Sequence, residues 1–227
     1  MTTNKRTIKV WSPLIRIGHW TLVIAFFTAY FTEDDFMTLH VWTGYIVGAY
    51  LLIRILWGFV GSKYVRFTSF VYSPAKIFGY LKNLITRKPQ HYIGHNPAGG
   101  AMVIALLFSL AVTTLTGMKL YAVEDNKGPF AITAGQAQSQ IQSVSLIAEA
   151  KAEDDDEDEE SKVINNSHKV DKQAEEFWEE LHELFANLTL LLVLLHIVGV
   201  IVSSYIDKEK LVKAMLTGEK EIDDTYQ

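Results

Sequence analysis

Long apolar stretches alternate with charged segments along this chain of 227 residues. Four of the stretches have about the 20 residues that an α-helix needs to cross a bilayer. The spans that we predict are residues 14–31, 38–60, 101–121 and 181–205. The first contains Arg16 and His19 and lacks a signal-peptide cleavage pattern, so we interpret it as a retained span. The pattern therefore predicts an all-α membrane protein, built as a four-transmembrane-helix bundle.

The charges of the connecting segments indicate how this bundle is oriented. Residues 61–100, between the second and third spans, contain lysines and arginines and no acidic residue. Basic residues also precede the first span and follow the fourth, whereas the turn 32–35 and the segment 122–180 are acidic. Because lysine and arginine near spans stay in the cytoplasm, we expect the N- and C-termini there. The segment 122–180 is then periplasmic.

Three segments lie outside the predicted spans. Residues 74–88 place apolar side chains at helical spacing opposite basic ones, which indicates an interfacial amphipathic helix on the inner membrane surface. Residues 122–180 are rich in alanine, glutamine, serine and acids, which predicts a long acidic loop that is partly disordered. Its acidic run, 152–161, is either a solvated tether or a docking patch. Residues 206–227 form a cytoplasmic tail, and residues 1–121 hold the first three spans.

Four histidines lie inside the predicted spans. His182 and His196 are fourteen residues apart on the fourth span, so they share one helix face and differ in depth by about 21 Å. His19 lies near the cytoplasmic start of the first span and His40 near the outer start of the second. The sequence thus supplies His19 and His196 at an inner level, and His40 and His182 at an outer level.

Polar side chains are costly inside a bilayer and usually serve a function there. Two imidazoles at one depth on facing helices suit the axial ligation of a haem iron. Each histidine could instead form a hydrogen bond to a neighbouring helix. The absence of cysteine excludes thiolate metal sites, iron–sulfur clusters and covalent haem attachment. Four histidines at two matched depths therefore favour two non-covalent haems b, with the pairs His19–His196 and His40–His182 as ligands.

Basic residues near the two levels are candidates to bind haem propionates. Arg54 lies fourteen residues after His40, which places it at the inner level, and Arg16 lies one turn before His19. Lys119 has the corresponding position at the outer level. Arg16 and Lys119 could also extend towards lipid headgroups.

The segment before the third span can begin a helix. Asn96 can cap the helix N-terminus, and Gly99 allows close approach of the backbone. A helix N-terminus also offers N–H donors to a carbonyl or anionic oxygen. We interpret His91 and His95 as surface or quinone-site residues and not as haem ligands, and His168 as solvated.

Several motifs together make the chain resemble a known family. RIGHW (16–20), LHVWTGY (39–45), HYIGHNPAGGAM (91–102) and LHELFANLTLLLVLLHIVG (181–199) resemble the bacterial cytochrome b561 family, which includes the cytochrome b subunits of nickel–iron hydrogenases. The resemblance covers the chain except for 125–175. The resemblance implies a four-helix bundle with two haems b bound by the four histidines. The likeness to formate dehydrogenase relatives also implies a quinone site bordered by Asn96 and Gly99. The long acidic segment departs from the family pattern, so the surface with which family members usually bind their partner cannot be assigned in this chain.

These observations predict a di-haem electron carrier of the bacterial inner membrane, surrounded by lipid and without a nucleic-acid partner. It would transfer electrons between the quinone pool and a periplasmic c-type cytochrome or oxidoreductase subunit. Two alternatives stay open at this point, a stand-alone superoxide:quinone oxidoreductase and a haem-free membrane anchor for a redox complex. We expect an electron-transfer subunit, with no side chain that is itself catalytic.

Overall fold

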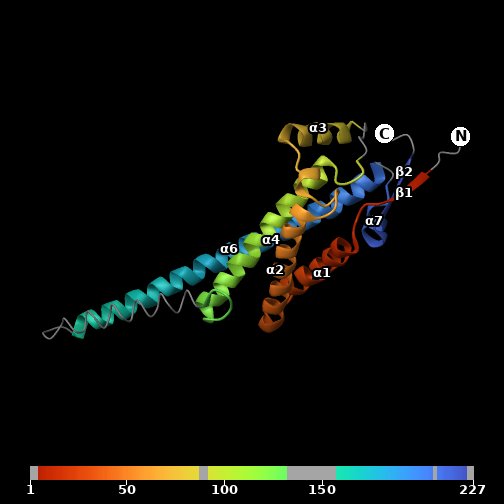
Figure 1. Ribbon diagram of the computed structural model, residues 1–227. Coiled ribbons are helices and arrows are strands. Elements are labelled where there is room, and N and C mark those ends of the chain that lie inside the picture. Colours follow the sequence, from red (N-terminus) through yellow and green to blue (C-terminus); the bar gives the residue numbers. More distant parts are fainter. Residues whose placement is uncertain (1–4, 87–91, 132–156, 207–208, 224–227) are drawn as a thin grey trace. The chain divides into compact units, whose positions relative to one another are not determined.

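A computed structural model of the chain describes residues 5–86, 92–131, 157–206 and 209–223 (Figure 1). The chain divides into two compact units, which are considered separately. The first unit comprises residues 1–111 and 187–227, and the second comprises residues 112–186. Two long helices, α4 (Pro97–Glu124) and α6 (Glu157–Ile206), contribute residues to both units.

The core of the first unit lies between the membrane helices. Helices α1 (Pro13–Tyr30) and α2 (Met37–Val60) are joined by a short turn and pack against one another. Their buried apolar side chains join one residue of α4 in a single cluster, formed by Ala25, Phe26, Val47, Leu51 and Leu110. A buried hydrogen bond of 2.7 Å between the hydroxyl groups of Ser109 and Thr189 links α4 to α6. Such a bond satisfies two polar groups that would otherwise be costly in an apolar environment.

Three stretches of the described residues are long and apolar enough to cross a membrane. They are Met37–Val60, Pro97–Glu124 and Lys172–Ile206, and they contain the predicted second, third and fourth spans. Helix α1 has 18 residues, as expected for the first span, but it is not among these three stretches. The helical character of all four predicted spans is confirmed, whereas the number of membrane crossings stays a prediction.

The prediction of a loop up to residue 180 was wrong for residues 157–180, whereas residues 125–130 form the expected turn after α4. Helix α6 begins at Glu157, so residues 157–180 are helical and precede the span without a break. Glutamate, lysine and alanine are good helix formers, and extending an existing helix avoids the cost of nucleation. Residues 132–156 of the predicted loop lie outside the described residues.

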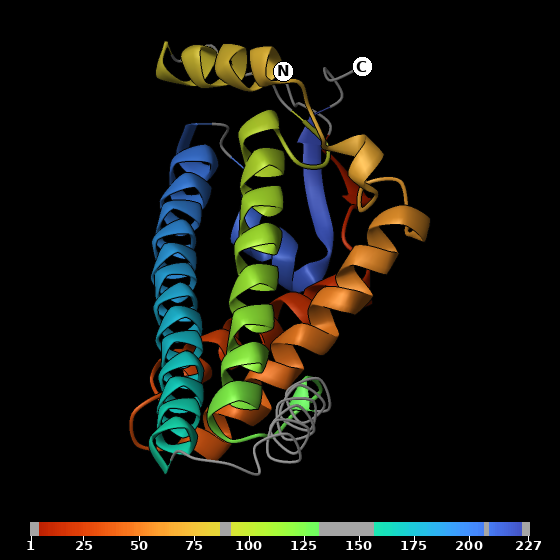
Figure 2. The ribbon, with the colours of Figure 1, turned by 90° about the vertical axis from the view of Figure 1, so that its left-hand side faces the viewer.

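The predicted tail, 206–227, contains regular structure that the sequence pattern did not indicate. Strand β1 (Lys5–Lys9) pairs antiparallel with β2 (Glu219–Asp223), and the short helix α7 (Leu211–Thr217) precedes β2 (Figure 2). Gly218 has a φ of 84°, a conformation that favours glycine, and its carbonyl accepts hydrogen bonds from the N–H groups of Val10 and Trp11. The two ends of the chain are thereby joined.

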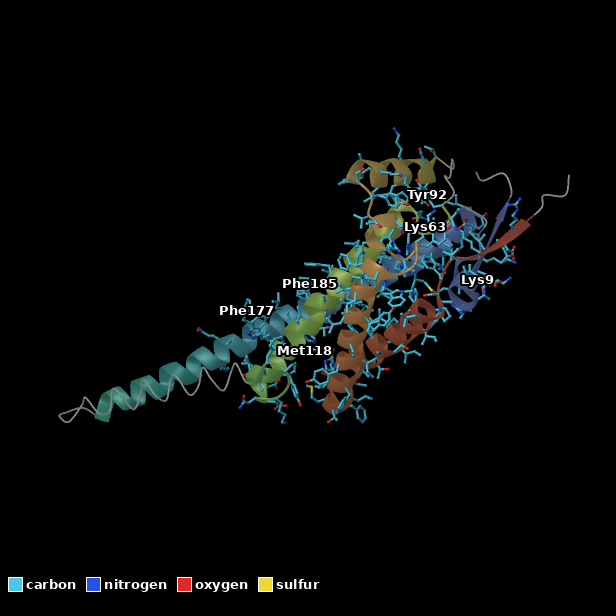
Figure 3. All side chains as sticks on the ribbon, in the orientation of Figure 1. Lys9, Lys63, Tyr92, Met118, Phe177 and Phe185 are labelled. Atoms are coloured by element: carbon cyan, nitrogen blue, oxygen red, sulfur yellow. The ribbon has the colours of Figure 1, made fainter. Side chains whose placement is uncertain are left out.

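A buried lysine attaches this ribbon to the segment that leads into α4. The Lys220 side chain is 8% exposed, and its Nζ lies 2.7 Å from a carboxylate oxygen of Glu209. Nζ also donates a hydrogen bond of 2.5 Å to the carbonyl of Tyr92, which is labelled in Figure 3. A paired and hydrogen-bonded ammonium avoids most of the cost of burying a charge. The segments before α1, before α4 and after α6 therefore meet at one end of the first unit.

The amphipathic helix expected at residues 74–88 is present as α3 (Pro74–Ile85). It follows a 3₁₀ turn, Phe67–Ser69, and ends at Ile85, with Thr86 as its C-cap, while residues 87 and 88 lie outside the described part. Phe78 on α3 is 71% exposed, so its apolar surface is not covered within the chain. This exposure suits a helix on a membrane surface, which stays our prediction for α3.

Candidate haem-binding site

The inner pair of histidines lies within the first unit. His19 is on α1 and His196 is on α6, and the two rings are close enough to interact electrostatically. The Nδ1 atom of His19 is buried and has no hydrogen-bond partner among the described residues. A buried polar atom without a partner is costly, so Nδ1 of His19 suits a hydrogen-bond partner that the described residues do not supply. An iron bound by the other ring nitrogen would suit this pair.

His40 forms a hydrogen bond that prepares its ring for a metal. Its Nδ1 lies 2.9 Å from the backbone carbonyl of Ala29 near the end of α1. A carbonyl only accepts, so Nδ1 carries the proton and Nε2 presents a lone pair. This arrangement fixes the tautomer and the orientation of the ring, as in many metal sites.

His182 has the same arrangement within the second unit. Its Nδ1 lies 2.9 Å from the carbonyl of Thr113 and 3.3 Å from the hydroxyl oxygen of Thr116, both on α4. A Cβ atom at Gly117 would lie only 2.7 Å from Cε1 of the His182 ring (Figure 3 labels the next residue, Met118). The absence of a side chain at Gly117 therefore lets the imidazole lie against α4 with Nε2 as the metal-binding nitrogen.

The described residues contain no group of three or more histidine, cysteine, aspartate or glutamate side chains that could hold a metal ion. Two imidazoles suffice for an iron whose remaining four ligands come from a porphyrin. The donor set thus fits haem, and the hydrogen-bonded Nδ1 atoms of His40 and His182 support this fit.

Arg54 is a buried cation on α2, in the first unit. Its side chain is 7% exposed, and its guanidinium lies 5.5 Å from the ring centroid of Phe67 and 5.8 Å from that of Phe70. Its Nη1 is buried without a hydrogen-bond partner among the described residues. A buried arginine is normally paired, so this orphaned N–H group suits an anionic group such as a propionate.

His95 is close enough to Arg54 to interact with it electrostatically. Its ring contacts those of Trp11 and Phe70, with centroid separations of 4.7 and 4.8 Å. Burial lowers the pKa of His95 to about 3, with smaller contributions from Arg54, His196 and Lys220. His95 is therefore packed between two aromatic side chains and partly buried, and its interpretation as a surface or quinone-site residue stays a prediction.

The remaining predicted site residues have other contacts. The guanidinium of Arg16 donates a hydrogen bond to the carbonyl of Leu216 on α7. Lys119 lies over the ring of Phe130, at 4.6 Å from its centroid. Lys119 and Nη1 of Arg16 therefore have contacts within the chain, whereas the buried Nε of Arg16 has no hydrogen-bond partner among the described residues. The binding of both cations to propionates stays a prediction.

Asn96 acts as the helix cap that the sequence predicted. Its Oδ1 accepts a hydrogen bond of 2.7 Å from the N–H of Gly99, and its Nδ2 donates one of 3.3 Å to the Ser203 hydroxyl on α6. These two hydrogen bonds explain the presence of Asn96, which caps the N-terminus of α4 and links α4 to α6. A quinone beside Asn96 and Gly99 stays a prediction.

A family model described as prokaryotic cytochrome b561 matches residues 10–218, which is most of the chain. The chain belongs to the prokaryotic cytochrome b561 family. The resemblance seen in the sequence motifs is thereby confirmed. Membership in this family makes the chain a multi-pass protein of the bacterial inner membrane, and it implies haem b as the cofactor.

Curated relatives of this cytochrome b561 family chain carry the name "probable Ni/Fe-hydrogenase B-type cytochrome subunit". The relative from Bradyrhizobium diazoefficiens is 26% identical over 149 residues, which cover 52% of this chain and 60% of the relative. That from Azotobacter chroococcum is 26% identical over 158 residues, covering 56% and 65%. That from Rhizobium leguminosarum bv. viciae is 23% identical over 149 residues, covering 52% and 62%. The chain thus spans about three-fifths of the length of these relatives. No solved structure matches it.

Proposed function

We propose that this cytochrome b561 family member is a di-haem electron carrier that transfers electrons across the inner membrane. One observation carries the proposal: His40 and His182, which the sequence places at one depth, both direct Nδ1 at a backbone carbonyl. That hydrogen bond leaves Nε2 as the ligand atom in each ring. The proximity of His19 and His196 supports the second pair.

The roles of the residues follow from their positions. His19 and His196 hold the inner haem, and His40 and His182 hold the outer one. Arg54 pairs with a propionate of the inner haem, because its buried Nη1 has no other partner among the described residues. Each haem supplies one-electron chemistry by cycling between Fe(III) and Fe(II). Two axial imidazoles leave no open position on the iron, which suits electron transfer rather than oxygen binding.

Four membrane crossings agree with the contacts at the ends of the chain. Because β1 pairs with β2, the segments before α1 and after α6 lie on one side of the membrane, which requires an even number of crossings. Three helical stretches qualify as spans by length and composition, so α1 supplies the fourth. The contact of Lys220 with the Tyr92 carbonyl supports a position of the start of α4 on the same side. Lysine and arginine concentrate on this side, which makes it cytoplasmic.

The partners follow from the charge distribution and the relatives. We propose that quinone exchanges electrons with the inner haem near the start of α4. A periplasmic oxidoreductase subunit or c-type cytochrome exchanges electrons with the outer haem. The hydrogenase subunits among the relatives favour a hydrogenase-like partner. Glutamates of α6 close to His182 would attract a basic surface on that partner, in an encounter that salt weakens.

Single alanine variants of the four histidines test the proposal. His19→Ala and His196→Ala should damage the same haem, and His40→Ala and His182→Ala should damage the other. Each variant should keep one low-spin haem, because the intact pair still binds its iron. Low-temperature visible spectra of the purified variants distinguish the two centres. The pairing is wrong if His19→Ala and His40→Ala remove the same component, and the ligand assignment fails if all four variants keep both.

A further inference from the structure

A groove runs between α1 and α7, which both belong to the first unit (Figure 1). Its volume is about 350 Å³, which falls within the range of small-molecule binding sites. Most of its lining is apolar and comes from both helices: Ile17, Trp20 and Ile24 on α1, and Met215 and Leu216 on α7. The groove therefore offers an apolar surface to a ligand from two sides.

The α1 side of the groove is the helix face opposite His19. Helical spacing of i, i+3, i+4 and i+7 puts four lining residues on this face, namely Ile17, Trp20, Thr21 and Ile24. His19 comes two residues after Ile17, which is about 200° around the helix. A group bound by His19 therefore does not fill the groove. Ile17 and Ile24 are each 67% exposed, so the described part of the chain leaves most of their apolar surface uncovered.

Arg16 supplies the positive charge of the groove. One of its five N–H donors goes to the carbonyl of Leu216, and its buried Nε has no hydrogen-bond partner among the described residues. No carboxylate in the described ranges forms an ion pair with Arg16. The α7–β2 turn packs closely against this side chain, because a Cβ at Gly218 would lie 3.1 Å from Nε. The guanidinium is thus held at the groove and still lacks an anion.

The lining of the groove also favours one class of lipid headgroup. Every phospholipid carries a phosphate, which a guanidinium binds well. A choline or ethanolamine headgroup adds a cation that would need a carboxylate, and the described residues that line the groove include no acidic side chain. The rise from Ile17 to Ile24 is about 10 Å, roughly two-thirds of the hydrocarbon depth of one leaflet. An acyl chain can therefore lie along this face below a phosphate at Arg16.

We propose that the groove between α1 and α7 binds one anionic phospholipid of the inner leaflet. The phosphate pairs with Arg16, and an acyl chain lies between the apolar side chains of the two helices. The level of the groove in the bilayer rests on the proposed topology, in which α1 is a span that begins at the cytoplasmic side. The binding itself requires no haem. The bound lipid attaches α7, and with it the β1–β2 ribbon, to the membrane surface.

Native mass spectrometry of the purified full-length protein in detergent, with phosphatidylglycerol or phosphatidylcholine added, tests the charge selectivity. One phosphatidylglycerol should bind about tenfold more tightly than phosphatidylcholine. Arg16→Gln should weaken the binding of phosphatidylglycerol about tenfold or more, which is the effect of losing a hydrogen bond to a charged group. Lys63→Gln is the matched control, because it removes an exposed cation of the same unit outside the groove. Equal binding of the two lipids, or equal effects of Arg16→Gln and Lys63→Gln, would overturn the proposal.

Leu216→Ala tests the apolar wall and keeps the backbone carbonyl that accepts the hydrogen bond from Arg16. It should weaken the binding of both lipids by a similar factor, whereas Val212→Ala, an exposed apolar position of α7 outside the lining, should not. Unchanged lipid binding by Leu216→Ala would overturn the proposal.

Two further results would identify a different occupant and so overturn the proposal. Displacement of phosphatidylglycerol by inorganic phosphate would show that a free anion is the ligand. A dimer that binds no lipid and that Leu216→Ala separates would show that a second copy of the chain covers the groove. A haem-free protein that still bound phosphatidylglycerol selectively would support this inference although the proposed function had failed.

Discussion

Replacing Gly117 by alanine should damage the outer haem site and leave the inner one intact. The new Cβ would lie 2.7 Å from Cε1 and 3.0 Å from Nδ1 of His182, whereas ordinary contact begins at 3.4 Å. The ring or α4 would therefore have to move by about 0.7 Å, the difference between 3.4 and 2.7 Å. A binding site tolerates displacements of only about 0.5 Å. The His182 ring cannot simply turn away, because its Nδ1 is held by the carbonyl of Thr113.

The size of the effect follows from two contributions. Loss of the hydrogen bond between His182 and Thr113 costs about 1 kcal/mol, and overpacking costs about 1–3 kcal/mol. Together they correspond to a roughly 30- to 1,000-fold weaker binding of the outer haem. Haem content per chain and the low-spin spectrum of purified Gly117→Ala measure this loss. The component that disappears should be the one that His182→Ala also removes.

A second glycine provides the control. Gly79 on α3 has no atom within 4 Å of the position that a Cβ would take, so Gly79→Ala makes the same chemical change without a clash. It should keep both haems. If Gly117→Ala also kept both haems with unchanged spectra, the reasoning about the approach of His182 to α4 would be refuted. Loss of the component that His19→Ala removes would refute it equally.

Three further predictions address the spans and their surroundings. Gly44 and Gly199 lie one turn after His40 and His196, and neither has an atom within 4 Å of the position that a Cβ would take. If haem fills that space, Gly44→Ala or Gly199→Ala should lower the haem content of the purified protein. An unchanged haem content would show that the haems lie elsewhere. A reporter inserted within residues 150–165 should be active only if it is an enzyme that works after export, because the basic segments keep the opposite ends of the helices in the cytoplasm. Activity of a cytoplasmic reporter at this position would overturn the orientation. Deleting residues 150–162 should reduce the salt dependence of electron exchange with a basic cytochrome, as measured by stopped-flow spectroscopy; an unchanged salt dependence would leave the acidic run as a solvated tether.

The membrane helices and the ligand candidates were the predictable part of this protein. Long apolar runs have few alternatives to helix in a bilayer, because every backbone polar group must be satisfied within the segment. The fourteen-residue spacing of His182 and His196 also follows from helix geometry alone. These local constraints suffice to place residues on faces and at depths.

Features that depend on contacts between distant segments were not predictable. The pairing of β1 with β2 joins residues near the two ends of the chain, and neither five-residue strand has a distinctive pattern. The hydrogen bond from His182 to Thr113 uses a backbone carbonyl, which every residue has. Likewise, the contacts of His95 with Trp11 and Phe70 arise from three separate segments. The helical start of α6 was missed for a different reason, because its acidic composition also suits a disordered loop.

The haem content and spectrum of the purified full-length protein test the central claim most directly. A pyridine haemochrome assay against protein concentration should give two haems b per chain, because the chain offers two pairs of imidazole ligands. The untreated protein should show a low-spin bis-imidazole spectrum in both oxidation states. A protein that purifies folded and without haem, or with one high-spin haem per chain, would contradict the account.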